Sequence, residues 1–291
     1  MDSLFADLHI HTKHSDGFLS PEECVKKARM AGIATISITD HDTTGGIQSA
    51  IKEGAKRGIE VIPGIELSAQ AKNSNEKEIH ILGYYINWED KHFQEKLKLF
   101  RQAREKRACL ILEKLKKIGI ILDEKRLFET AGIGFIGRLH FAKLMVEQHV
   151  VEYTQDAFNK YLGDGKPAYV PKLRLSPEEA IKMILKVGGI PVVAHPNFGN
   201  INRRSIKSLV KAGLKGIEVF HPSSSAEKIG TFKKLASDLG LLITGGSDFH
   251  GLEEKNFVKL GSIKIPYSSV VELKKYKNEL DSNRTGIFAV S

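Results

Sequence analysis

The segment LFADLHIHTKHSDG, Leu4 to Gly17, determines what fold and chemistry we expect of this chain. Its first eight residues alternate between aliphatic side chains and Phe5, Asp7, His9 and His11. Because successive side chains of a β-strand point to opposite faces, a strand here places the acid and both histidines on one face. So many histidines and aspartates in one short stretch favour a site that binds something charged over a chance polar loop.

The residues that follow repeat a pattern of strand, loop and helix. Ser20-Pro21-Glu22-Glu23 has the order of an N-cap, a first-turn proline and a capping-box glutamate, so it predicts a helix that stops at Gly32. ATISITDHD predicts a second strand, and a second helix is expected from Gly45 to about Gly58. Further β-rich runs are EVIPGIELSA, EIHILGYYI, GGIPVVAHP, GIEVFHP and LLITGGSDFH. Several are apolar on both faces, as in a parallel sheet covered by helices, so we predict an α/β fold of (β/α) barrel type.

Length and composition set the broad class. The chain has 291 residues, of which 41% are hydrophobic, and this suffices for one large α/β domain or a domain with a smaller insertion. Neither cysteine, Cys24 or Cys109, has a partner at metal-binding spacing, which fits a reducing compartment. The sequence opens with no charged-then-apolar leader and has no membrane-length apolar run, so we expect a cytoplasmic protein. The net charge of +9 favours an anionic partner such as a phosphate ester, a nucleotide or a nucleic acid.

Polar residues gather where the predicted strands end, which is where the active sites of such barrels lie. They are His9, His11, Asp16, Asp40, His41, Glu66, His80, His195, Asp248 and His250. A single histidine is more often an ordinary core or surface group, but a series at successive strand ends is not explained in that way. Imidazole and carboxylate donors without cysteine suit zinc, manganese or iron, and they outnumber what one ion requires. We therefore predict two or three metal ions.

Together these motifs resemble the polymerase-and-histidinol-phosphatase (PHP) superfamily of metal-dependent phosphoesterases. The motifs are HIH followed by HSDG, then TDHDT, GIE, the histidine of EIHILGY, AHP and GSDFH. The resemblance implies a distorted (β/α)7 barrel with a trinuclear site of manganese, iron or zinc. It further implies three ligand sets: His9, His11, Glu66 and Asp248; Glu66, His80 and His195; Asp16, His41 and His250. Asp40 is expected to orient one imidazole from behind.

The chemistry of phosphate esters accounts for such a site. A phosphomonoester is a dianion with a poor leaving group, so its hydrolysis needs an activated nucleophile and positive charge on the phosphoryl oxygens. Paired metal ions supply both. We expect a metal-bridging water, as hydroxide, held near Glu66, Asp248 and His195 to attack in line. No serine or cysteine nucleophile is expected.

The middle of the chain departs from the barrel pattern. From Phe93 apolar residues recur at helical spacing among many lysines and arginines, which predicts a long basic amphipathic helix. More helical pattern continues to about Tyr161. We therefore predict a barrel formed by residues 1–90 and 170–291, interrupted by a helical insertion (cap) domain at 91–169 that selects the substrate.

The substrate is suggested by motifs in this insertion. GIGFIGR, ending at Arg138, matches G-x-G-x-x-G formally, but no strand precedes it, so a dinucleotide fingerprint is rejected. GRLHFAKLM and LGDGKPAYVPK resemble the PHP branch that acts on nucleotide phosphates, the 3′,5′-nucleoside bisphosphate phosphatases and 5′-3′ exoribonucleases. That branch usually has proline where Leu139 stands. Arg138 is the best phosphate ligand outside the metals, because a guanidinium matches phosphate oxygens.

Weaker candidates for substrate binding complete the set. They are Lys166, Lys172 and, through the resemblance of GIEVFHPSSS to the same branch, His221. Three functions remain open: a phosphatase of nucleotides such as 3′,5′-bisphosphates, with short RNA or DNA oligonucleotides as further partners; a histidinol-phosphate phosphatase; and a metal-free interaction module. The retained ligands disfavour the last. The sequence implies no protein partner and no membrane.

Overall fold

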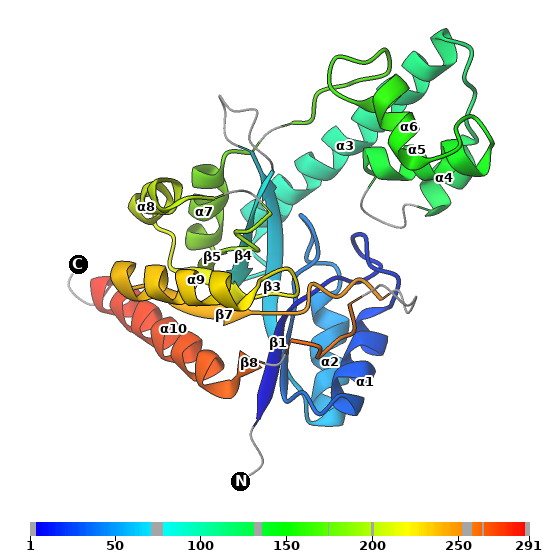
Figure 1. Ribbon diagram of the computed structural model, residues 1–291. Coiled ribbons are helices and arrows are strands. Elements are labelled where there is room, and N and C mark those ends of the chain that lie inside the picture. The colour runs from blue at the N-terminus through cyan, green and yellow to red at the C-terminus, as the bar shows by residue number, and fades with distance from the viewer. Residues whose placement is uncertain are drawn as a thin grey trace. The chain divides into compact units, whose positions relative to one another are not determined.

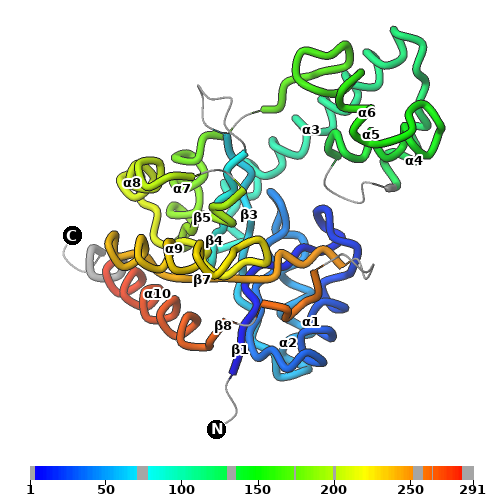
Figure 2. The backbone as a smooth tube through the Cα atoms, in the orientation of Figure 1, coloured from blue at the N-terminus to red at the C-terminus, as the bar shows by residue number. Residues whose placement is uncertain are grey.

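The computed structural model describes residues 4–70, 78–130, 136–173, 175–198, 201–251, 258–263 and 265–288 (Figures 1 and 2). The chain divides into two compact units, Met1–Gln94 with Arg174–Ser291, and Glu95–Leu173. We call the first the barrel unit and the second the insert. That the insert acts as a cap stays a prediction.

The barrel unit is built on one eight-stranded sheet. Its strands are β1 (Phe5–Ile10), β2 (Thr35–Ile38), β3 (Glu60–Ala69), β4 (Ile79–Tyr84), β5 (Ile190–Val193), β6 (Gly216–Phe220), β7 (Leu242–Gly245) and β8 (Ile265–Pro266). They are hydrogen-bonded in the order β7-β6-β5-β4-β3-β2-β1-β8. Beyond β7 the chain returns to β1, where Ile10 and Phe249 form a parallel bridge. The sheet therefore nearly closes, and the predicted α/β barrel is confirmed.

Strand β4 differs from the uniformly parallel sheet that the apolar runs suggested. It is antiparallel to both neighbours. Gly64–Ala69 of β3 pair with Tyr84–Ile79 of β4, and Ile81–Tyr84 of β4 pair with Val193–Ile190 of β5. No helix is assigned between β3 and β4 among the described residues. Two antiparallel strands can be joined by a short turn, whereas two parallel strands need a crossover connection, which is usually a helix. The two-residue β8, antiparallel to β1, is a further strand that the sequence did not predict.

Helices cover the outside of the sheet. In the barrel unit they are α1 (Pro21–Met30), α2 (Ile47–Arg57), α7 (Pro177–Lys186), α8 (Arg203–Lys211), α9 (Ala226–Leu239) and α10 (Tyr267–Phe288). The predicted capping box at Ser20 is present, and an equivalent one starts α7 at Ser176. Helices α1 and α2 lie together beside β1, while α9 and α10 lie beside β7 (Figure 1). These local signals fix where α1 and α7 start.

The insert has a core of its own. Helix α3 (Lys91–Lys117) begins in the barrel unit, and the remaining elements are α4 (Glu124–Thr130), α5 (Arg138–Glu147), α6 (Thr154–Ala157) and the π-helical turn η1 (Phe158–Leu162). The long helix expected from Phe93 is thus observed. Buried side chains include Leu115, Leu127, Phe141 and Met145. The first four residues of GIGFIGR, at 132–135, lie outside the described residues.

Glycine at position 246 is required because two backbones approach closely there. A Cβ on Gly246 would lie 2.4 Å from both the Cβ and the backbone nitrogen of His9. We expect Gly246→Ala to lower the free energy of unfolding by about 2–3 kcal/mol, because neither backbone can move without disturbing the strand. Denaturant titration measures this loss.

Gly230 provides the matched control, because no atom lies within 4 Å of its Cβ position in the middle of α9. Gly230→Ala should stabilise the protein by up to about 1 kcal/mol, since alanine is the better helix former. Equal effects of the two substitutions would contradict the steric argument.

Candidate metal centre

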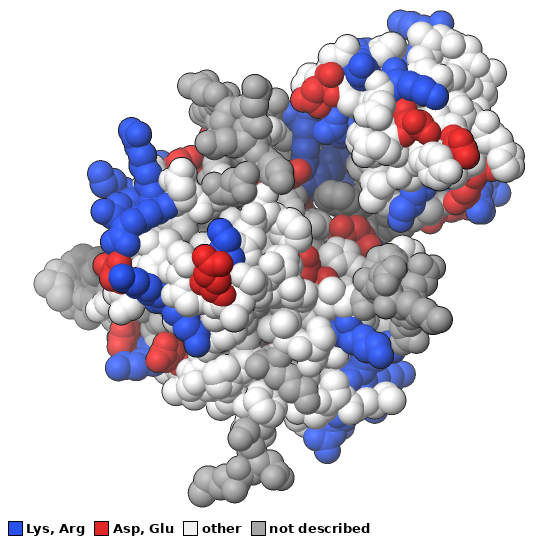
Figure 3. Space-filling model, in the orientation of Figure 1, with Lys and Arg blue, Asp and Glu red and all other residues white. Residues whose placement is uncertain are grey.

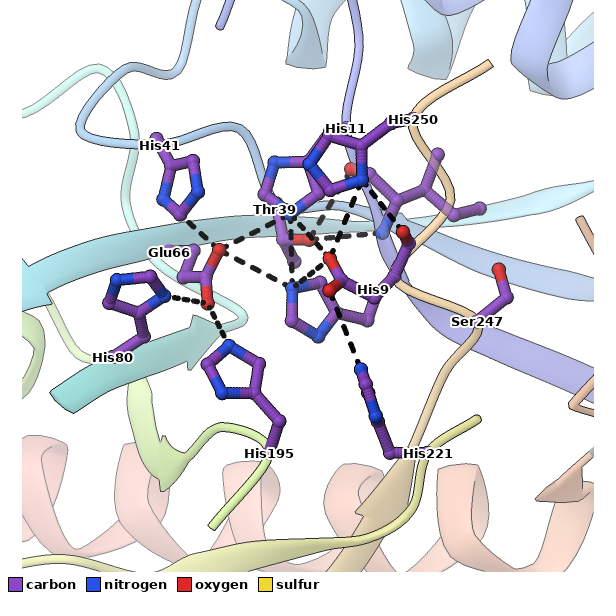
Figure 4. A network of polar contacts seen from close by, with 12 residues as sticks. His9, His11, Thr39, His41, Glu66, His80, His195, His221, Ser247 and His250 are labelled. Carbon is purple, nitrogen blue, oxygen red and sulfur yellow. Dashed lines mark hydrogen bonds and ion pairs between the residues drawn. The ribbon is translucent and has the colours of Figure 1, made fainter. Parts of the chain in front are cut away.

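Nine side chains converge at one rim of the barrel, and Figure 4 labels Glu66 and the six histidines among them. His9 and His11 come from the end of β1, Asp16 from the following loop and His41 from the residues after β2. Glu66 lies within β3. The others are His80 from β4, His195 after β5, and Asp248 and His250 after β7. The reversed direction of β4 explains the position of His80, which sits near the start of its strand and still reaches this rim, instead of ending a parallel strand as expected.

Two imidazole nitrogens lie close to each other and to two carboxylate oxygens at the centre of the group. Nε2 of His9 and Nε2 of His11 are 3.1 Å apart. Glu66 Oε2 lies 3.4 and 3.2 Å from these nitrogens. Asp248 Oδ1 lies 3.3 and 3.1 Å from them. Ligands about 2.1 Å from one tetrahedral ion are about 3.4 Å apart, so this spacing is that of a coordination shell.

Two further groups flank this one. Glu66 Oε1 lies 2.9 Å from His80 Nδ1 and 3.1 Å from His195 Nε2. Asp16 Oδ2 lies 3.7 Å from His41 Nε2 and 3.4 Å from His250 Nε2. Three groups of possible metal ligands result: His11, Asp16, His41 and His250; His9, His11 and Glu66; and His41, Glu66 and His80. Glu66 is shared between two of them, and the exact ligand sets expected from the sequence stay a prediction.

The environment of Glu66 tests whether cations fit. Its Oε2 is buried and lies 3.1–3.4 Å from ring nitrogens of His9, His11 and His41. None of these contacts within the described residues has the angles of a hydrogen bond. A buried carboxylate oxygen that faces several nitrogens without such a bond is the arrangement that a cation between them satisfies. The donor set therefore fits divalent metal ions.

Glu218 on β6 supports the ring of His9 and the backbone of His195, and sequence reasoning missed it. It is fully buried, and its Oε1 lies 2.9 Å from His9 Nδ1. Because Glu218 occupies Nδ1, the other ring nitrogen of His9, Nε2, points to the central group of donor atoms. Glu218 Oε2 accepts a 2.7 Å hydrogen bond from the backbone N–H of His195. The sequence did contain one signal for Glu218, since it is a single acidic residue within the otherwise apolar strand GIEVF.

Asp40 does not orient an imidazole directly, which corrects the expectation from the sequence. Its carboxylate accepts hydrogen bonds from the N–H and the hydroxyl of Thr12, both at 2.7 Å, and from the Ser15 hydroxyl at 2.6 Å. Ser15 Oγ in turn lies 3.5 Å from His11 Nδ1. Asp40 therefore holds the loop after β1, and reaches His11 only through Ser15.

Protonation follows the same contacts. Burial alone would lower the pKa of His11, but the adjacent carboxylates of Asp248, Glu66 and Asp16 raise this pKa to about 10. Burial likewise opposes protonation of His80, yet Glu66 raises its pKa to about 9. His41 differs, because burial dominates and lowers its pKa to about 3. In this arrangement protons compensate the buried carboxylates.

Of the expected substrate-binding residues, His221 lies beside the centre. It is 4% exposed, and its Nε2 lies 3.4 Å from Asp248 Oδ2. Its Nδ1 lies 2.8 Å from Ser223 Oγ. The ring thus borders the metal group without belonging to it.

Arg138 makes several contacts within the insert. It forms a 2.8 Å ion pair with Asp164 and donates a 3.1 Å hydrogen bond to the Leu162 carbonyl. Its guanidinium also lies 5.8 and 5.6 Å from the ring centroids of Phe158 and Tyr169. Lys166 and Lys172 belong to the insert as well. Phosphate binding by these three residues stays a prediction.

Comparison with known proteins places this geometry in a family. The model of the PHP domain matches residues 7–126. The 3′,5′-nucleoside bisphosphate phosphatase of Chromobacterium violaceum is 35% identical over 249 residues, which cover 84% of this chain and 86% of that protein. The chain belongs to the PHP family. It is a metal-dependent hydrolase, which removes the metal-free interaction module from the three alternatives.

Two other PHP-related proteins extend the comparison. The 5′-3′ exoribonuclease Rnm of Escherichia coli is 36% identical over 253 residues, or 84% of each chain. A solved structure from Bifidobacterium adolescentis, assigned as a metal-dependent phosphoesterase, matches with a TM-score of 0.79 and 28% identity over 92% of this chain and 94% of that one. Among the described residues, no helix is both long and apolar enough to span a membrane.

Metal loading of this PHP protein should release protons. Below a pH of about 10 the His11 ring keeps a proton that a metal ligand must lose, and His80 does so below about 9. A rising pH removes the competing proton, so we expect the apparent affinity for Mn²⁺ or Zn²⁺ to increase from about pH 6 to about pH 8. Calorimetric titration of metal-free protein in two buffers of different ionisation enthalpy measures the release. Identical heats in both buffers would show that the ligands are already deprotonated.

Proposed function

We propose that this PHP protein is a phosphatase that hydrolyses a phosphate monoester of nucleotides. Nucleoside 3′,5′-bisphosphates are the preferred small substrates, and the 5′ end of short oligonucleotides is a second class. The observation that carries the proposal is the placement of Glu66, whose two oxygens face different groups of imidazoles. Two cations that share one carboxylate need this arrangement. The relatives named for bisphosphate and RNA substrates support the nucleotide class.

Two or three divalent ions of manganese, iron or zinc would occupy the three ligand sets described above. Histidine and carboxylate donors suit these ions, and no cysteine belongs to the sets. When bound, the ions would activate a water molecule and neutralise charge on the phosphoryl oxygens. Glu66, Asp248 and His195 hold the space where that water would stand.

The surrounding side chains orient the ligands and border the substrate. Glu218 fixes the ring of His9, and Asp40 fixes the loop that carries Asp16. His221 has a ring nitrogen at the edge of the centre, so we assign it to contact with a substrate oxygen. Arg138 would bind the second phosphate of a bisphosphate, with Lys166 and Lys172 adding positive charge. Binding energy at this spectator phosphate can orient the reacting one.

Histidinol phosphate is the alternative substrate. It has one phosphate and an ammonium group, so its recognition needs an acidic or polar pocket. The insert instead contributes the cationic helix α3, which ends with Lys114, Lys116 and Lys117. Charge therefore favours the nucleotide bisphosphate.

Glu66→Ala should remove more metal than any other single ligand substitution, because two groups lose a donor. We expect the phosphatase activity to fall at least about 100-fold, the loss typical when a charge-stabilising group is removed from a reacting centre. Metal analysis and phosphate release on the same sample measure both effects. Chelation should abolish the activity of the unaltered protein.

Glu60→Ala is the matched control on the opposite end of the same strand, where Glu60 pairs with Lys274 at 2.8 Å. This variant should keep its metal content and its activity. Full activity after thorough removal of metal would refute the proposed mechanism.

The choice of substrate is tested by comparing adenosine 3′,5′-bisphosphate, adenosine monophosphate and histidinol phosphate under one metal condition. We expect the highest kcat/KM for the bisphosphate. Arg138→Ala should lower this value about 10- to 100-fold, the worth of one hydrogen bond between charged groups, while a generic aryl phosphate loses much less.

Arg126→Ala is the control within the insert, because Arg126 also forms an exposed ion pair, at 3.0 Å with Glu147. It should affect no substrate selectively. Preference for histidinol phosphate, or an Arg138 variant equally harmless to every substrate, would overturn the assignment.

A further inference from the structure

A groove between helices α8 and α9 lies outside the metal centre. Its volume is about 540 Å³, within the range of roughly 300–1,000 Å³ that ligand sites occupy. Three buried apolar side chains, Ile201, Phe232 and Leu235, line it together with the cationic side chains of Arg203, Lys228 and Lys234. An apolar surface with a charged rim suits a ligand that is flat and apolar on one side and anionic on the other.

The charge of this groove is only partly neutralised. No acidic residue belongs to its lining, and among the described residues the ammonium groups of Lys228 and Lys234 have no hydrogen bond or ion pair. Arg203 alone is paired, with Asp238 at 2.7 Å. Helix α8, RRSIKSLVK, contains four cations and no acid. Lysine and arginine side chains gather over this helix in Figure 3. The groove therefore attracts anions.

The groove adjoins the metal centre through the chain itself. Asn197 lines it and follows His195 by two residues, so their Cα atoms are at most about 7.6 Å apart. The Asn197 amide donates a 3.0 Å hydrogen bond to Ser224 Oγ. Its Oδ1 is buried and has no hydrogen-bond partner among the described residues. This oxygen can accept from a ligand donor, such as an exocyclic amine or a ribose hydroxyl.

Phe198 borders the metal centre and directly follows Asn197, which lines the groove. Its side chain is 51% exposed, which is unusual for phenylalanine beside a polar centre. Its ring makes T-shaped contacts with His195 and His221, with centroids 5.5 and 5.6 Å away. These contacts fix the ring at the rim while leaving much of it exposed to a ligand.

We propose that Phe198 and the α8–α9 groove form a track for single-stranded nucleic acid whose 5′ end enters the metal centre. Proteins that bind single strands combine stacking aromatic rings with a positively charged groove. Here Phe198 would stack on a base near the 5′ end, and Arg203, Lys228 and Lys234 would contact the phosphates that follow. An acidic peptide would match the cations but not the exposed ring. The direction of the strand rests on the proposed function, whereas binding in the groove does not.

The test uses the metal-loaded protein and a fluorescent single-stranded oligonucleotide of about eight nucleotides, with hydrolysis-resistant phosphorothioate linkages. Fluorescence anisotropy gives Kd at several salt concentrations. The combined variant Arg203→Gln, Lys228→Gln, Lys234→Gln should raise Kd at least about 10-fold and reduce the slope of log Kd against log salt by about 2, or roughly 0.7 for each lost phosphate contact. Phe198→Ala should raise Kd about 5- to 100-fold with little change in slope.

The matched control removes three cations from helices α1 and α2, in the variant Lys26→Gln, Arg29→Gln, Lys52→Gln. It should bind the oligonucleotide like the unaltered protein. Circular dichroism and metal content should agree for all variants. The combined variant of the three groove cations should also be assayed for hydrolysis. Its kcat/KM should fall more for a hydrolysable oligonucleotide than for adenosine 3′,5′-bisphosphate.

The possible results distinguish a failure of the proposed track from a failure of the proposed function. A groove variant with unchanged Kd and salt slope would overturn the track while leaving the phosphatase intact. An acidic peptide that binds as tightly, with the same dependence on the three cations, would overturn the assignment to nucleic acid. Tight oligonucleotide binding without hydrolysis of any nucleotide phosphate would support the track and overturn the proposed function.

Discussion

The burial of one carboxylate among imidazoles is the constraint on which the rest of this structure depends. Glu66 is 1% exposed, and an isolated charge at such a position would be strongly unfavourable. Burial raises the pKa of Glu66, but the charges of His41, His80 and His9 outweigh burial and hold it well below its usual value. Only the rim of a nearly closed barrel lets so many strands deliver a side chain to one point. The architecture and the charge network therefore require each other.

Backbone strain is concentrated at the same rim. His195 and Asp248 have φ values of 24° and 52°, a region that side chains other than glycine avoid. They lie two and three residues beyond the ends of β5 and β7, where the chain must turn inward to aim the side chain. The buried Glu218 holds the strained segment at His195 through its backbone N–H. A site of this kind uses the stability of the surrounding barrel to maintain conformations that would be unfavourable by themselves.

Local patterns predicted much of this fold because they act on neighbouring residues. The alternation in β1 placed His9 and His11 on one face, and the capping box at Ser20 fixed the start of α1. Periodicity does not encode strand direction, so the reversal of β4 was missed, although His80 was rightly expected at the rim. Hydrogen bonds across the barrel could not be predicted from the sequence either. Glu218 contacts a residue 209 positions away, a distance over which the sequence carries no local signal.

Formal charge links the proposed metal centre to its proposed substrate. The three sets contain three carboxylates, Asp16, Glu66 and Asp248, which together contribute a charge of −3 when ionised. Two divalent ions would add +4 and three would add +6, leaving +1 to +3 within these ligand sets. A phosphate ester dianion would compensate much of this excess where the low dielectric makes each charge count. Further phosphates of a longer substrate find no partner there. Their charge must be met by cations elsewhere in the protein, as the basic surface of α8 and α9 can do.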